Sequence, residues 1–161
     1  MECPLTPLEG VPTYEYMKNL NVYLNLCSSA LDCTLGCGIL GYLVLTAQPA
    51  VFNTHCGTEF ITPINLGIHP VMPDPASTAA ILSELVRIHK HQVRLFNEYH
   101  RVDRACKKVI IKLILEKLYK SVSSRIIGFA KVTSLEILTH LITDYAELEE
   151  EDVQGFDRKI K

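Results

Sequence analysis

Tryptophan is absent from this chain of 161 residues, and its apolar runs are short. The longest, residues 39–47, is about half as long as a membrane-spanning helix, which needs ~20 residues. The first ten residues contain acids, no basic residue and no apolar core of the kind that a secretory signal has. These absences argue against a secreted or membrane protein, and we expect a cytoplasmic chain with no membrane partner.

Sequence motifs of the common enzyme classes are also missing. We find no G-x-S-x-G, P-loop, G-x-G-x-x-G, H-E-x-x-H or D-[ST]-G pattern. The glycine-rich GCGILG at residues 36–41 has no clear strand before it and no phosphate-reaching lysine after it, so a packing or turn role fits it better. Cys106 with His100 would need a third orienting group to act as a nucleophile pair. We expect no enzyme, no catalytic residue, no cofactor and no small-molecule substrate.

Metal-ligating residue types are present, but their spacing is poor. Cys33 and Cys37 are followed by the adjacent pair at 55–56, and neighbouring residues hinder each other in binding one ion. His89 and His91 would point about 200° apart on a helix. The chain has six cysteines, and the absence of a secretory signal favours a reducing environment with free thiols. We expect no metal site.

Apolar residues recur at helical spacing along most of the chain, which predicts an all-α fold. We expect a helical bundle of about six to eight helices, in one domain or in two small lobes. Its parts are an extended leader at 1–12, an N-terminal helical part at 13–60, a proline-rich loop at 61–76 and a C-terminal helical part at 77–161.

Some helix boundaries can be predicted more closely. Thr13 is placed to cap a helix that ends near residue 32. The apolar register over 77–117 would make a helix of about 60 Å, whereas a compact domain of this size has a radius of gyration of only about 15 Å. We therefore expect a break near 101–103 or at Leu115. The weaker predictions are helices at 36–47, 50–60, 125–131 and 149–160.

The segment T-S-L-E, which begins at Thr133, predicts a helix start with a capping box. In this motif the threonine hydroxyl accepts from the backbone N–H three residues on, and the Glu136 carboxylate accepts from the backbone N–H of the threonine. We expect a helix that buries Leu138 and Leu141 and is followed by an acidic segment at 147–152.

Charge is strongly segregated, although the net charge is only −2. Residues 1–75 carry −5, residues 76–131 carry +8 and residues 132–161 carry −5. These charges either pair within the fold or form a basic surface between two acidic ones. A separated basic surface would contact polyanions or acidic surfaces of neighbouring copies.

The basic region contains a stripe at helical spacing. Arg101, Arg104, Lys108 and Lys112 fall at i, i+3, i+7 and i+11, and Lys107 flanks them. These five residues are our candidate nucleic-acid-binding site, because such a stripe neutralises phosphates. No aromatic residue interleaves it, so base stacking is not indicated. The alternative is the solvated face of an amphipathic helix.

A pattern of packing positions extends over residues 89–153. Its parts are Phe96 and Tyr99, an apolar helix with lysines at 105–113, Tyr119, the threonine cap at Thr133, and L-T-H-L-x-x-x-Y at 138–145 before acidic residues. Together with PTYEYMKNLNVYLN at residues 12–25, this pattern resembles the N-terminal Gag (capsid) region of copia-type LTR retrotransposons over about two-thirds of the chain.

The resemblance implies an all-helical capsid subunit that assembles with copies of itself and encloses the element's RNA. The chain departs from the family in having no early tryptophan, no C-x2-C-x4-H-x4-C zinc knuckle, and no protease or integrase motif. We expect a non-enzymatic Gag-like self-association protein, as an isolated fragment or a host-derived copy, with RNA as a second partner. The alternative is a small nucleic-acid-binding or protein-interaction module that uses the basic face at 101–112.

Overall fold

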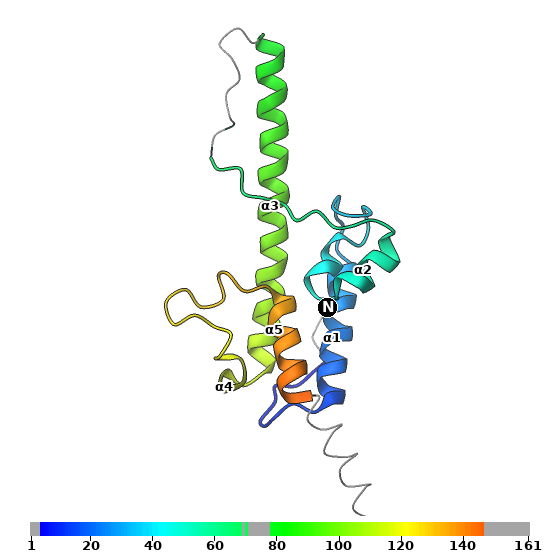
Figure 1. Ribbon diagram of the computed structural model, residues 1–161, viewed down its shortest axis with the longest axis vertical. Helices are drawn as coiled ribbons and strands as arrows, with labels where there is room; N and C mark the ends of the chain where they lie inside the picture. The colour runs from blue at the N-terminus through cyan, green and yellow to red at the C-terminus, as the bar shows by residue number, and fades with distance from the viewer. Residues whose placement is uncertain (1–3, 69, 71–77, 147–161) are drawn as a thin grey trace, which may run out of the picture.

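The computed structural model describes residues 4–68, 70 and 78–146, and Figure 1 shows their arrangement. The elements, in chain order, are α1 (Tyr14–Ser29), the 3-10 helix η1 (Gly41–Leu45), α2 (Pro49–Cys56), α3 (Ala79–Leu113), α4 (Glu116–Tyr119), α5 (Ser134–Leu141) and the π-helix η2 (Ile142–Ala146). The described part contains no strand, so the all-α class is confirmed. Its five α-helices do not confirm the expected number of about six to eight.

Helix starts are fixed by local hydrogen bonds. The Thr13 hydroxyl accepts from the Tyr16 backbone N–H at 3.2 Å, as predicted, although α1 ends at Ser29 and not near residue 32. At α5 the predicted capping box is present: the Glu136 backbone N–H donates to the Thr133 hydroxyl at 3.2 Å, and the Glu136 carboxylate accepts from the Thr133 backbone N–H at 2.6 Å. Each bond satisfies an N–H group that a helix start leaves unpaired.

The main core lies where α1 and α5 pack against the C-terminal half of α3. Leu20, Ile110, Ile137 and Leu141 are fully buried in it. Burial of each such side chain contributes about 1.5–3 kcal/mol. Leu8 joins the core from residues 4–12, and its backbone N–H donates to the Leu113 carbonyl at 2.9 Å, which satisfies one carbonyl at the end of α3.

A second group of apolar residues joins η1 and α2 to the middle of α3. The aromatic ring of Phe60 connects the two sides, because it contacts Phe52 edge-on at 5.5 Å and stacks with Tyr99 of α3 at 5.8 Å between ring centroids. Phe52 is completely buried. We call residues 33–60, which include η1 and α2, the small lobe.

Helix α3 is continuous over 35 residues, a length of about 52 Å. The predicted break near 101–103 is wrong, because Asp103 is buried and its side chain bonds to Ser134 instead of competing for the backbone of its own helix. The helix ends at Leu113, and Leu115 is the N-cap of α4, so the alternative break at Leu115 is correct to within two residues. The N-terminal half of α3 extends past the other helices (Figure 1).

Three of the weaker helix predictions need correction, and glycine explains two of them. Gly36 and Gly38 have φ of 57° and 82°, so the run at 36–47 turns before η1 instead of forming one helix. Gly57, with φ of 67°, ends α2 at Cys56. The segment 125–131 forms turns, because the Ser124 hydroxyl accepts from the backbone N–H groups of Ile126 and Ile127. The predicted helix at 149–160 lies outside the described residues.

We predict that the Gly36 position tolerates no side chain. A Cβ there would lie 2.8 Å from the Cζ atom of the buried Phe52, whereas a Cβ at Gly38 would meet nothing within 4 Å. Both glycines have a φ angle in the left-handed region, so Gly38→Ala is a control for backbone strain alone. Urea unfolding should show Gly36→Ala to be less stable than Gly38→Ala by about 1–3 kcal/mol. Equal losses of stability would contradict this packing.

Candidate functional site

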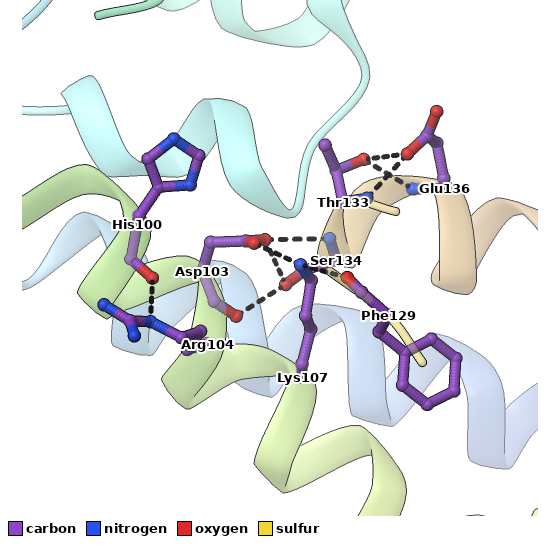
Figure 2. Close-up of polar contacts among 8 residues, drawn as sticks. All are labelled: His100, Asp103, Arg104, Lys107, Phe129, Thr133, Ser134 and Glu136. Atoms are coloured by element: carbon purple, nitrogen blue, oxygen red, sulfur yellow. Dashed lines mark hydrogen bonds and ion pairs between the residues drawn. The ribbon is translucent and has the colours of Figure 1, made fainter. Parts of the chain in front are cut away.

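Four of the five predicted cations form an exposed stripe on α3. Arg101, Arg104, Lys108 and Lys112 are all exposed, over about 16 Å of helix length. The Arg104 guanidinium is oriented by a hydrogen bond from its Nε to the His100 carbonyl, at 3.1 Å (Figure 2). The stripe is therefore available to an anionic partner.

Lys107, the fifth predicted cation, is not part of the stripe. Its side chain is 10% exposed, pairs with the Asp103 carboxylate and donates to the Phe129 carbonyl at 3.2 Å (Figure 2). Lys107 lies on the same face of α3 as Asp103, one turn earlier. This face packs against the segment just before α5, which contains Phe129. Lys107 thus has its partners within the fold, although it also lines the groove described below.

Asp103 is the centre of a buried polar cluster that joins α3 to α5. Its Oδ1 atom accepts from the Ser134 backbone N–H at 2.9 Å and from the Ser134 hydroxyl at 2.7 Å, while Oδ2 faces the Lys107 ammonium (Figure 2). Ser134 is the first residue of α5 and is completely buried. The cluster is therefore a structural ion pair with hydrogen-bonded neighbours. Sequence spacing does not predict it, because 31 residues separate Asp103 from Ser134.

Asp103→Ala should destabilise the protein strongly, because it leaves the buried Lys107 ammonium without its carboxylate. The expected loss is about 3–5 kcal/mol in the free energy of unfolding. Arg104→Ala is the control: it removes a neighbouring charge that is exposed, and should change stability by no more than about 0.5 kcal/mol. Urea denaturation of both variants measures the difference, and a small loss for Asp103→Ala would show that the cluster is dispensable.

A groove of about 590 Å³ lies beside the stripe, between α3 and the chain before α5. Arg104 and Lys108 line it together with Phe96, Phe129 and His100. The Phe96 and His100 rings are 4.3 Å apart. No aromatic residue interleaves the stripe in the sequence, but the fold brings Phe129 to it from a distant segment. We call this the basic–aromatic groove.

Arg101 lies on the rim of a different groove, of about 490 Å³, between α1 and α3. Its floor is mostly apolar and includes Leu24, Val102 and Ala105, while Asp32 and Glu98 share the rim with Arg101. The predicted stripe therefore contributes to two grooves of different chemistry. This second groove suits an apolar group, whereas the basic–aromatic groove suits an anion that carries a planar ring.

The candidate metal and nucleophile residues lie in different surroundings. His89 is buried and His91 is exposed, and no group of three or more His, Cys, Asp or Glu side chains that could hold a metal ion occurs among the described residues. Burial raises the pKa of Cys106 to about 12, so this thiol stays protonated at neutral pH and is a poor nucleophile beside His100. His55, next to Cys56 in the sequence, is exposed.

Apolar side chains are exposed on the N-terminal half of α3. Ile81 is 50% exposed and Ile88 is 43% exposed, and Leu85 between them is half-buried. We call Ile81, Leu85 and Ile88 the apolar face. As for membranes, none of the helices in 4–68 or 78–146 has the length and hydropathy that crossing a bilayer requires.

No family model, curated protein or solved structure matches this chain. Any assignment of function therefore depends on the geometry of the chain itself.

Proposed function

We propose that this chain is a non-enzymatic helical protein whose copies associate with one another, as its resemblance to the Gag region of copia-type LTR retrotransposons implies. The observation that supports the proposal is the apolar face on the projecting half of α3. Exposed apolar surface that continues a core stripe is typical of a protein–protein contact.

The apolar face is an extension of the stripe that forms the core. Ile81, Leu85 and Ile88 are spaced by four and three residues, and the same line along the helix continues to Leu95 and Tyr99. Leu95 and Tyr99 are buried against the small lobe, whereas Ile81 and Ile88 stay about half exposed. The same helix thus has one apolar stripe, which the small lobe covers only in part.

The other side of this half of α3 is charged. Arg87 makes a bidentate ion pair with Glu84, at 2.6 and 2.7 Å, and Arg94 lies 3.8 Å from Glu98. These pairs are exposed and contribute little to stability. They keep the polar side of the helix in water, so the apolar face is the side available for burial in a complex.

A second copy of this chain is the occupant that we propose for the apolar face. Two such faces related by a two-fold axis bury the same residues on both partners, so the contact closes without exposing a new surface. The apolar face, from Ile81 to Ile88, is about 10 Å long. It offers fewer residues than the roughly 20–30 per partner of a standard interface, so the association should be weak and concentration-dependent.

The variant Ile81→Lys/Ile88→Lys should abolish this association, because it places two charges on each copy where apolar side chains would be buried. Sedimentation velocity over a range of concentrations should show a shift from monomer to dimer for the wild type, at low and at high salt. Ile126→Lys is the control, since Ile126 is 93% exposed and lies in the turn at 124–128, outside the α3 sequence.

Two results would overturn the self-association proposal. One is a wild-type chain that remains monomeric at every concentration. The other is a dimer that survives unchanged in the double lysine variant, because the contact would then lie elsewhere on the molecule. Circular dichroism checks that the variants keep their helical content.

The basic–aromatic groove favours single-stranded RNA binding as a second function. It combines Arg104 and Lys108 with Phe96 and His100, whose ring centroids are 4.3 Å apart. Cations neutralise phosphates, and base–aromatic stacking contributes about 1–3 kcal/mol per base, so the two together suit a nucleotide chain. RNA binding in this groove is compatible with the Gag-like role. It does not depend on self-association.

Arg104→Ala/Lys108→Ala should weaken binding of a fluorescent single-stranded RNA and make it less sensitive to salt. Each lost phosphate contact lowers the slope of log affinity against log salt by about 0.7 for a single strand, so the double variant should lose about 1.4. Lys117→Ala/Arg125→Ala is the matched control, because both cations are exposed and neither lines the groove. Equal losses in the two variants would mean that RNA binds without using the groove.

A further inference from the structure

The groove between α1 and α3, which we call the α1–α3 groove, carries two opposite charges that are not paired with each other. Asp32, which follows α1, and Arg101, in α3, both line this groove of about 490 Å³. Both residues are exposed, and neither side chain makes an ion pair or a hydrogen bond with another described residue. Glu98, the third charge in the lining, already lies 3.8 Å from Arg94. A ligand that carries both charges therefore finds a partner for each.

A buried tyrosine adds a hydrogen-bond donor to the α1–α3 groove. Tyr42 of η1 lines the groove and is only 4% exposed, and its hydroxyl makes no hydrogen bond with another described residue. This hydroxyl is not sealed in the interior, because the buried side-chain oxygens without a partner in the described part belong to Asn21 and Asn25. Burial, followed by the Glu98 carboxylate, raises the pKa of Tyr42, so the hydroxyl keeps its proton at neutral pH.

The rest of the lining is mostly apolar. Leu24 and Cys106 are buried there, and Val102 and Val109 are half-buried. The volume of the groove lies within the range of about 300–1,000 Å³ that is typical of small-molecule sites, which combine an apolar lining with a few polar groups. An apolar group would therefore leave water in this groove while a charged end stays at the rim.

A buried hydrogen bond holds two walls of the α1–α3 groove together. Ser28 of α1 lines the groove, and its Oγ atom lies 2.9 Å from the Oγ1 atom of Thr46, which follows η1. Both residues are 1% exposed. Since this contact ties η1 to the end of α1, Tyr42 is fixed relative to α1 before any ligand binds. A site formed in advance loses less conformational entropy on binding.

We propose that the α1–α3 groove binds a free α-amino acid with a large apolar side chain. The Arg101 guanidinium and the Tyr42 hydroxyl donate to its carboxylate, and the Asp32 carboxylate accepts from its ammonium. The side chain of the ligand packs on the apolar lining. An apolar amino acid fits because it carries both charges at one end and an apolar group at the other. This binding requires neither self-association nor RNA, because the apolar face and the basic–aromatic groove are separate from the α1–α3 groove.

L-Tryptophan is a suitable probe, because the chain itself contains no tryptophan. The indole emission of the ligand should shift to shorter wavelength and saturate as full-length protein is added. Tryptamine lacks the carboxylate, and 3-indolepropionate lacks the ammonium. Each of these should bind about fivefold more weakly than L-tryptophan, because each loses one ion pair at the rim of the groove.

Two charge-neutralising variants assign the two ends of the ligand. Asp32→Asn should bind L-tryptophan only as tightly as 3-indolepropionate, because the ammonium then has no partner. Arg101→Gln should bind L-tryptophan only as tightly as tryptamine, for the same reason at the carboxylate. Glu116→Gln and Arg125→Gln are the matched controls and should change none of these affinities, since both residues are exposed and lie outside the groove.

Three results would overturn the amino-acid proposal. The first is the absence of a saturable shift with L-tryptophan at millimolar concentration. The second is equal affinity for the three indole ligands, because the groove would then recognise only an apolar group. The third is unchanged binding in Ala105→Phe, which places a large side chain in the groove from an exposed position and should abolish the shift. Circular dichroism checks that each variant keeps its helical content.

Discussion

The buried Asp103 carboxylate is the contact on which the arrangement of the helices depends. It holds the first residue of α5 through two hydrogen bonds and neutralises Lys107 from the same helix (Figure 2). Because Ser134 is fixed there, the next turns of α5 direct Ile137 and Leu141 into the main core. A buried carboxylate without these partners would cost several kcal/mol, so the cluster has to form as a unit.

Helix α3 is the common element of every surface that we consider functional. Its C-terminal half is covered by α1 and α5, its middle by the small lobe, and its N-terminal half projects (Figure 1). The apolar stripe runs through all three parts, and the exposed cations occupy another side of the same helix. Self-association and RNA binding would therefore use different faces of one rod, so one need not block the other.

The small lobe is held against α3 by aromatic contacts. They run from Phe52 through Phe60 to Tyr99 in the middle of the helix. Within the lobe, Gly36 lies so close to the Phe52 ring that a Cβ there would be 2.8 Å from its Cζ atom, so the turn before η1 and α2 are packed against each other.

Features that depend on neighbours within about four residues could be predicted from the sequence. The all-α class, the Thr13 cap and the capping box at Thr133 and Glu136 are of this kind, because their hydrogen bonds close within one helical turn. The exposure of Arg104 and Lys108 also followed from helical spacing.

Features that join distant segments could not be predicted from the sequence. The burial of Lys107, the continuity of α3 through residue 103 and the approach of Phe129 to the basic stripe all depend on contacts across about 20–30 residues of chain. Periodicity shows that position 107 is near the edge of a helix face, one turn after Asp103. It does not show that Lys107 donates to the Phe129 carbonyl, because a partner 22 residues away produces no pattern in local spacing.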